Sequence, residues 1–266
     1  MRIILSPAKK MRADAGLPWT TYPVFLNRTQ RLMEALQGMD DAALKLLWKC
    51  NDQIAALNVE RLGSMDLRKN LTPAILAYEG IAYQYMAPGV FTRQELDYVQ
   101  EHLRILSGFY GILRPFDGVT PYRLEMQAKL CVDGAKDLYA FWGDSLAREL
   151  LFDTDCIVNL ASKEYSAAVS KYVPDSVPFI TCTFGEMKNG KVIEKATMCK
   201  MARGVMVRYM AQNQITNPEE VKSFDLLDFC FAPEHSDDKN FVFLRYLNDS
   251  CFHLNSGRLA PCLFAR

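Results

Sequence analysis

The sequence predicts an α+β fold, with helices flanking one mixed sheet in a single domain. Apolar residues make up 50% of the 266-residue chain and charged residues 23%, which is ample material for one core. No linker-like stretch divides the chain. Helix-spaced and strand-like runs mix without a regular βαβ rhythm, which favours α+β over a doubly wound sheet.

The first part of the chain begins with a strand and continues with helices. Arg2–Leu5 is a short apolar run that ends at Ser6-Pro7, as in a buried strand. Apolar residues recur at helix spacing over Val24–Met65, with a break at Gly38–Asp40. We therefore expect separate helices on either side of the break. Pro73–Tyr78 is a second apolar run, which we expect to be a strand.

A capping box marks the start of the next helix. Thr92 can accept a hydrogen bond from the backbone three residues on, and Glu95 can reach back to the threonine. Apolar residues then follow at helix spacing as far as Leu106. This helix leads directly into residues 106–115, LSGFYGILRP.

The second half of the chain contains both element types. Asp137–Phe152 has helix spacing and Cys156–Leu160 reads as a strand. The Asn189-Gly190 pair between two apolar runs predicts a β-hairpin. Further elements are expected at Cys199–Gln212 (helix), Pro218–Val221 (short helix), Phe229–Ala232 and Phe241–Tyr246 (strands). We assign residues 1–247 to the domain and 248–266 to a C-terminal extension.

Composition also bears on function. The 31 basic and 31 acidic residues balance, so nonspecific nucleic-acid binding would need a local basic patch. No apolar stretch is long enough for a signal peptide or a membrane span, so we expect a cytoplasmic protein without a membrane partner. The eight cysteines include no C-x-x-C pair and the three histidines show no metal spacing. We expect no metal site and no cofactor.

The segment LSGFYG has two interpretations. A helix, a Gly-x-x-Gly turn and a second helix form a helix-hairpin-helix element, whose outward backbone N–H groups hold a DNA phosphate. Arg114 would then add a charge. The simpler interpretation is a glycine that ends a helix, followed by a packed turn. The residues alone favour the simpler one.

Four other segments carry polar side chains that suit a site, although each also has a structural explanation. Ser6–Lys10 follows a strand, and its lysines are equally well explained as solvated. Thr120–Met126 contains Arg123 and Glu125 within reach of each other. Asn159–Tyr165 joins a strand to a helix, with Ser162 as an N-cap. On Lys200–Gly204, Lys200 and Arg203 share a helix face, which is more often solvated than functional.

The order of these motifs resembles the YaaA family of bacterial peroxide-stress proteins. The resemblance implies a single mixed domain of unusual topology, a positively charged cleft, a helix-hairpin-helix element and DNA binding. It also implies a role in helping the cell survive hydrogen peroxide, with a lower level of free intracellular iron and less DNA damage. The matching stretches are Ile4–Lys9, Ala74–Gly80, His102–Pro115, Pro121–Met126, Asp137–Asp144, Val158–Tyr165 and Lys200–Gly204.

With this resemblance, we expect a monomeric peroxide-stress protein that binds double-stranded or distorted DNA and limits iron-driven oxidative damage. The expected DNA-binding residues are Ser107, Gly108, Phe109, Tyr110, Gly111, Arg114, Lys9, Lys200 and Arg203. The alternative is an enzyme acting on a nucleotide or nucleobase, if the polar motif residues converge in one pocket. Its candidate residues are Lys9, Arg123, Glu125, Asn159, Glu164, Tyr165 and Lys200. A third alternative is direct iron binding, which the scattered cysteines and histidines disfavour. No reaction can be assigned from the sequence, and the non-enzymatic reading is preferred.

Overall fold

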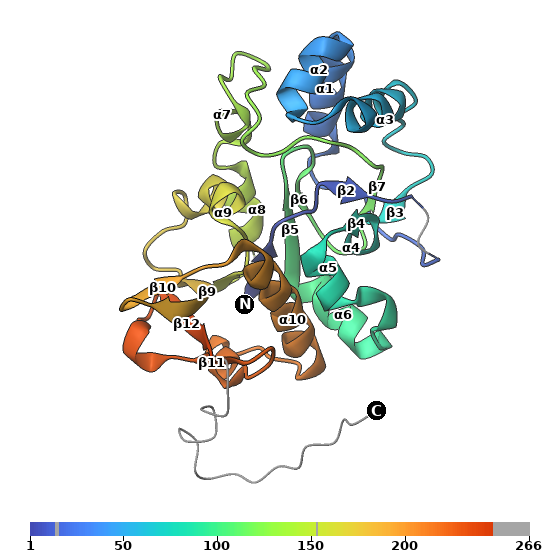
Figure 1. The fold of residues 1–266 in the computed structure, drawn as a ribbon. Helices are drawn as coiled ribbons and strands as arrows, with labels where there is room; N and C mark the ends of the chain where they lie inside the picture. The colour runs from blue at the N-terminus through green and yellow to red at the C-terminus, as the bar shows by residue number, and fades with distance from the viewer. Residues whose placement is uncertain (14–15, 153, 247–266) are drawn as a thin grey trace.

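A mixed β-sheet forms the centre of the computed structural model, which describes residues 1–13, 16–152 and 154–246 (Figure 1). The sheet order is β11-β12-β9-β8-β1-β5-β6, and β10 pairs with β9 outside this path. Neighbours from β12 to β5 are parallel, whereas β11, β6 and β10 are antiparallel to their partners. The predicted α+β class is confirmed. The strands are β1 (Arg2–Leu5), β5 (Leu103–Ser107), β6 (Gly111–Leu113), β8 (Ile157–Asn159), β9 (Phe179–Lys188), β10 (Lys191–Ile193), β11 (Phe229–Phe231) and β12 (Asn240–Arg245).

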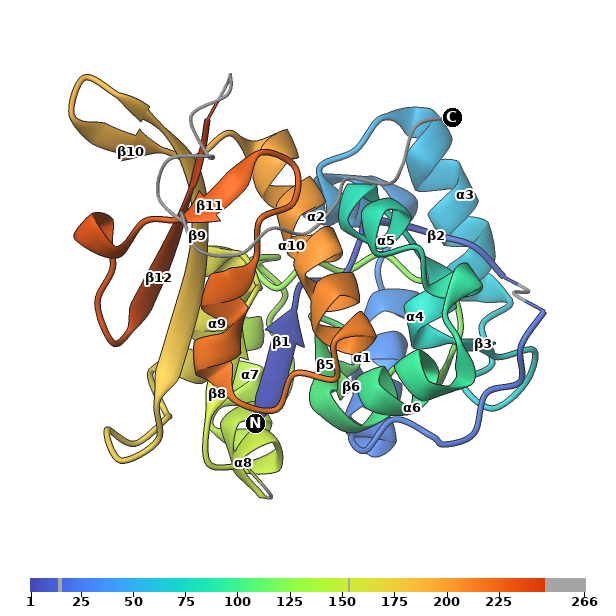
Figure 2. The same cartoon turned by 90° about the horizontal axis from the view of Figure 1, so that it is seen from below.

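Helices cover both faces of the sheet, which explains why β1 is buried along its length. Ile3 and Ile4 point to opposite faces and both are fully buried. Helices α5 (Ile81–Met86), α6 (Arg93–His102) and α10 (Ala196–Gln212) cluster on one side, and α8 (Ser145–Leu151) and α9 (Lys163–Ser170) lie on the other (Figures 1 and 2). Short 3₁₀ turns complete the set: η1 (Pro88–Val90), η2 (Pro218–Ser223) and η3 (Pro233–His235).

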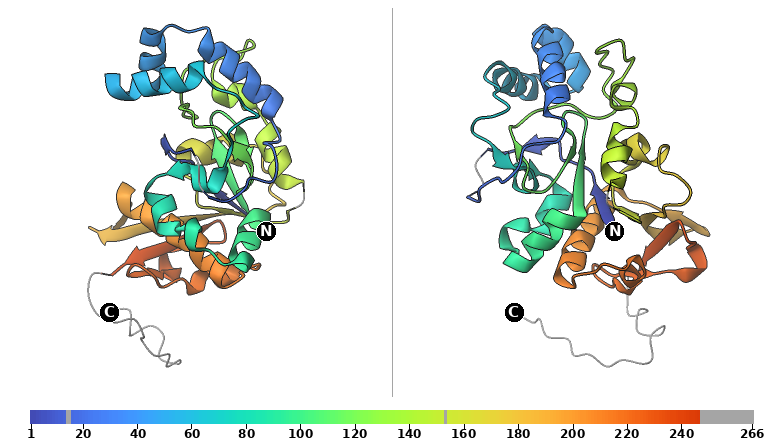
Figure 3. Two further views of the ribbon diagram at one scale, coloured as in Figure 1. Left: turned by 90° about the vertical axis from the view of Figure 1, so that its right-hand side faces the viewer. Right: turned by 180° about the vertical axis from the view of Figure 1, so that it is seen from behind.

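Three helices form a lobe beyond the end of the sheet (Figure 3). They are α1 (Leu26–Gln37), α2 (Asp41–Trp48) and α3 (Asp52–Gly63), and the predicted break at Gly38–Asp40 is confirmed. Asp40 caps α2 by accepting from the Ala43 N–H at 2.8 Å. Side-chain capping therefore fixes the break that the sequence indicated.

Other local predictions hold in part. The capping box of α6 and the β9–β10 hairpin are confirmed, with Asn189 and Gly190 both at positive φ. The predicted helix Asp137–Phe152 is interrupted at Gly143, where φ is +54°, and forms α7 (Leu138–Trp142) and then α8. Residues 248–266 lie outside the described residues. Within the described ranges, every helix is too short or too polar to cross a bilayer.

The predicted strand Pro73–Tyr78 is wrong. The segment forms a helical turn, α4 (Ala74–Ala77), between two short strands, β3 (Thr72–Pro73) and β4 (Tyr78–Glu79). β3 pairs with β7 (Gly118–Val119), and β4 pairs with β2 (Lys10–Met11). The N–H groups of the turn donate to carbonyls of residues 115 and 117, so tertiary contacts override the local strand pattern.

The predicted helix-hairpin-helix element at Ser107–Gly111 is also wrong. Helix α6 ends at His102, and the following residues form β5 because they pair with β1. The Gly-x-x-Gly turn then joins β5 to antiparallel β6. Phe109 and Tyr110 are fully buried, and their N–H groups donate to the Ser107 hydroxyl at 3.1 and 2.9 Å. These amides are occupied within the chain and cannot hold a phosphate from solvent.

Candidate active site

A crevice opens where the connections of two neighbouring parallel strands leave in opposite directions. Strand β1 lies between β5 and β8; the chain leaves β1 toward β5, whereas it leaves β8 toward β9. Ligands in open parallel sheets bind at such a switch point, beyond the carboxyl ends of the strands. A cavity of about 400 Å³ lies there, a size typical of small-molecule sites. Its polar lining comprises Ser6, Lys9, Lys10, Glu79, Tyr83, Tyr122, Arg123, Glu125, Ser162, Glu164, Tyr165, Lys200 and Arg203.

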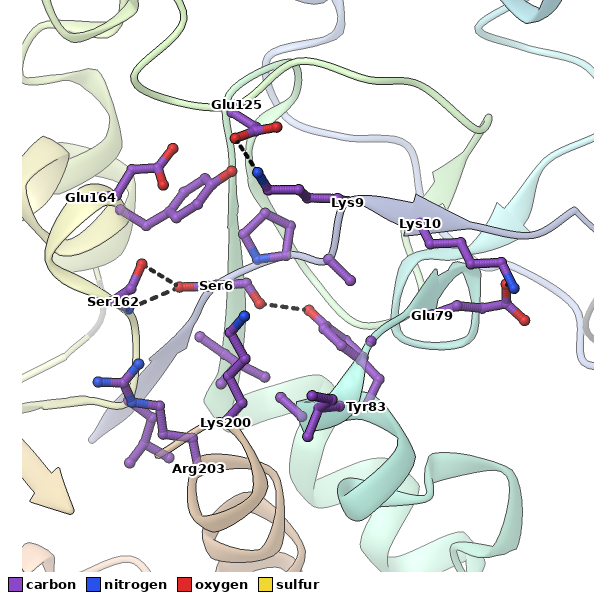
Figure 4. Close-up of a pocket in the computed structure, with 18 of the residues that line it drawn as sticks. Ser6, Lys9, Lys10, Glu79, Tyr83, Glu125, Ser162, Glu164, Lys200 and Arg203 are labelled. Carbon is purple, nitrogen blue, oxygen red and sulfur yellow. Dashed lines mark hydrogen bonds and ion pairs between the residues drawn. The ribbon is translucent and has the colours of Figure 1, made fainter. Parts of the chain in front are cut away.

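The loop after β1 forms the middle of the cavity wall (Figure 4). The Ser6 hydroxyl accepts from the Ser162 N–H at 2.9 Å and donates to the Ser162 hydroxyl at 3.2 Å, which ties the exits of β1 and β8 together. The Tyr83 hydroxyl donates to the Ser6 carbonyl at 3.0 Å. A Cβ at Gly80 would lie 2.7 Å from the Cβ of Ala8, so glycine allows α5 to begin against this loop.

Two carboxylates occupy one end of the cavity. Glu125 pairs with Lys9 at 2.7 Å through one oxygen and with Arg123 at 3.4 Å through the other. Glu164 lies nearby on the first turn of α9 and accepts from the Gln127 N–H at 3.2 Å. Lys9 and Arg123 therefore compensate Glu125, whereas Glu164 accepts from backbone donors and has no ion pair among the described residues.

The environment of Glu164 suits a proton donor. Burial raises the pKa of its carboxyl, and the neighbouring Glu125 adds to the rise. Burial likewise raises the pKa of the adjacent Tyr165 hydroxyl, which stays protonated near neutral pH. Two nearby carboxyl groups in different environments can divide the roles of acid and base.

Helix α10 supplies the opposite end of the cavity. Lys200 and Arg203 extend from it toward Ser6 and Ser162 (Figure 4). A Cβ at Gly204 would collide with the Ala82 carbonyl oxygen, so this glycine lets α10 pack directly on α5. That contact sets how far the two cations reach over the ends of the strands.

The segment LSGFYG supports this site from below. Because the Ser107 oxygen already accepts from two amides, its own hydrogen is directed to the Tyr122 hydroxyl at 2.6 Å. Tyr122 also bonds to the Tyr78 hydroxyl at 2.9 Å and lines the cavity. A Cβ at Gly108 would lie 2.6 Å from the Leu124 carbonyl oxygen, so glycine lets the segment that carries Glu125 pass. The motif is a scaffold for the cavity.

The structure brings together six of the seven residues predicted for an enzyme. Lys9, Arg123, Glu125, Glu164, Tyr165 and Lys200 all line the cavity. Asn159 does not: it is buried, donates to the Thr181 hydroxyl at 3.2 Å and accepts from the Ala161 N–H at 2.9 Å. It shapes the turn after β8. Ser6, Tyr83 and Tyr122 also line the cavity but were not predicted as site residues. Serine beside proline indicates a turn, Tyr122 was expected to pack, and Tyr83 lies outside the candidate segments.

The residues predicted to bind DNA are not brought together. Lys9, Lys200 and Arg203 line the cavity, whereas Ser107–Gly111 are buried beneath it. Arg114 follows β6, which is antiparallel to β5. It therefore lies beside the amino end of β5, whereas the cavity lies beyond the carboxyl ends of the parallel strands. No single surface presents this set to a duplex.

The chain is similar to a known protein family and to several bacterial proteins. A family model described as "Peroxide stress protein YaaA" matches residues 1–235. A UPF0246 protein of Lachnoclostridium phytofermentans is 54% identical over 92% of this chain and 96% of its own length. UPF0246 proteins of Pediococcus pentosaceus and Desulfitobacterium hafniense are 51% and 50% identical, each over 92% of this chain and 98% of its own length.

Proposed function

Because the chain belongs to the peroxide stress protein YaaA family, we propose that it serves this stress response as an enzyme acting on a nucleotide or nucleobase. One observation carries the proposal: six polar residues, singled out from four separate motifs, line one cavity at the switch point of the sheet. A site that only clamps a phosphate backbone needs cations. This one also holds three carboxyl groups and three buried tyrosines.

The proposed chemistry is proton transfer. Glu164, whose pKa burial raises, donates a proton to a ring or leaving-group atom. Glu125, held by Lys9 and Arg123, orients the ligand by accepting hydrogen bonds from its amino groups. The aromatic walls at Tyr83 and Tyr122 suit a planar base.

Product analysis tests this role. The purified protein is incubated with nucleotides and nucleobases, including oxidised ones, and turnover is followed by liquid chromatography and mass spectrometry. Glu164→Gln should lower the rate about 10²- to 10⁴-fold, the usual contribution of a positioned acid or base. Glu60→Gln, an exposed change outside the cavity lining, should leave the rate unchanged. Full turnover by Glu164→Gln would contradict the assigned role.

DNA binding that limits iron-driven damage is the second candidate, and the exposure of Lys9 and Lys200 supports it. If Lys9, Lys200 and Arg203 each neutralise one phosphate, the logarithm of the binding constant should fall with the logarithm of salt concentration with a slope of roughly −2 to −3. Fluorescence anisotropy with duplex and branched DNA measures this slope. A zero slope, or no binding at low salt, removes this candidate.

A further inference from the structure

The cations that line the cavity differ in how fully they are compensated. Lys9 and Arg123 share Glu125, and Lys10 pairs with Glu79 at 3.0 Å. Among the described residues, Lys200 has no ion-pair partner. Uncompensated positive charge is therefore concentrated on α10.

Arg203, one turn further along α10, is only weakly compensated. Its one ion pair within the described ranges is to Glu194 at 3.7 Å, and its side chain is 16% exposed. Its Nε is buried and has no hydrogen-bond partner in the described part of the chain. A buried, unsatisfied donor on a cation is costly unless a ligand completes it.

Two serine hydroxyl groups line the cavity together with these two cations. The Ser162 hydroxyl accepts from Ser6, so its own hydrogen is free to donate to a ligand. Figure 4 shows Lys200 and Arg203 directed toward this serine pair, with Glu125 and Glu164 at the far end. An anionic group is thus attracted most strongly to the α10 end of the cavity, because the cations at the other end are already paired with Glu125.

We propose that Lys200, Arg203, Ser6 and Ser162 form a subsite for one phosphate monoester, which makes a nucleoside monophosphate the substrate class of the proposed enzyme. A phosphate monoester carries a charge of about −1.5 to −2 at neutral pH, which two cations balance. The rest of the ligand then reaches Glu125 and Glu164, where amino groups are favoured. The further phosphates of a triphosphate would meet only cations that Glu125 and Glu79 already pair with, so a triphosphate is disfavoured.

Isothermal titration calorimetry of the full chain at fixed ionic strength tests the subsite. The probes are the four ribonucleoside 5′-monophosphates, the matching nucleosides and triphosphates, and ribose 5-phosphate. We expect at least one monophosphate to bind about tenfold or more tightly than its nucleoside and its triphosphate. Lys200→Ala should weaken monophosphate binding about 10- to 100-fold, as expected for a lost charged hydrogen bond.

Two controls exclude a loss of affinity caused by misfolding or by the removal of any surface lysine. Lys200 is exposed, so its replacement leaves the core intact, and Lys191→Ala removes an exposed lysine outside the cavity lining and should not change affinity. A monophosphate that binds Lys200→Ala at full strength, or no better than its nucleoside, overturns the subsite while the nucleobase pocket stands. Ribose 5-phosphate that matches the nucleotides supports the subsite but contradicts recognition of a base. If no probe binds, the subsite fails, and the product analysis with nucleobases and oxidised nucleotides decides the proposed function separately.

Discussion

Replacing Ser107 by alanine should destabilise the protein strongly, although this serine lies beneath the cavity and outside its lining. Its hydroxyl is fully buried, accepts from the N–H groups of Phe109 and Tyr110, and donates to Tyr122. Alanine would leave both amides without an acceptor in a site closed to water. Each buried, unsatisfied donor costs about 1–3 kcal/mol, so we expect a loss of about 3 kcal/mol in the free energy of unfolding.

Thermal unfolding measures this loss. For a chain of this size, each 1 kcal/mol lowers Tm by roughly 2–4 °C, so Ser107→Ala should melt roughly 6–12 °C below the wild type. Ser170→Ala, which removes an exposed hydroxyl at the end of α9, should shift Tm by no more than roughly 2 °C. A helix-hairpin-helix role for Ser107 would instead predict weaker DNA binding with unchanged stability. An unaltered Tm for Ser107→Ala would refute the scaffold interpretation.

Two further predictions concern stability. Gly204→Ala should lower the free energy of unfolding, measured in urea, by about 1–3 kcal/mol, because a Cβ would collide with the Ala82 carbonyl. Gly63→Ala, which has open space at its Cβ, should be neutral or stabilising. Equal stability of the two variants would contradict the close packing of α10 on α5. Burial raises the pKa of Asp117 to about 6, so the folded state binds a proton that the unfolded state releases, and stability should fall by about 3 kcal/mol as pH rises from about 4 to about 7. Asp117→Asn should flatten this part of the profile, and an unchanged profile would show that Asp117 does not titrate there.

The sequence predicted correctly those elements that depend on residues close together in the chain. The capping box at Thr92, the Asn189-Gly190 turn and the break at Gly38–Asp40 each satisfy backbone groups within a few residues. These predictions hold because little outside the segment competes with them. The strand β1 was predicted from its apolar run and the Ser6-Pro7 stop, although its partners β5 and β8 are distant in sequence.

Predictions failed where the partner is distant in sequence. Leu103 and Leu106 continue the helix spacing of α6, but pairing with β1 draws Leu103 and the residues after it into β5. Short apolar runs fit a helix and a strand equally well, and only the partner decides between them. The Gly-x-x-Gly turn at Gly108 and Gly111 was misassigned because the element after it was unknown.

The candidate site was predictable as a set of residues but not as a place. Lys9, Glu125, Glu164 and Lys200 belong to the polar motifs that the sequence singles out. Their convergence depends on the adjacency of β1 and β8, which are separated by about 150 residues of chain. No local pattern encodes that adjacency. The sequence indicates packing for Tyr122, and its hydrogen bond to Ser107, fifteen residues away, follows only from the fold.

Hydrogen–deuterium exchange with a nucleoside monophosphate at saturating concentration tests the central claim most directly. We predict that amide exchange slows in residues 6–10 and 160–165, where the loops after β1 and β8 line the cavity, and in residues 200–204 of α10. Exchange in the buried turn at residues 107–111 should stay as it is without ligand. Protection centred on that turn, or no protection of the strand exits, would contradict a ligand site at the switch point of the sheet.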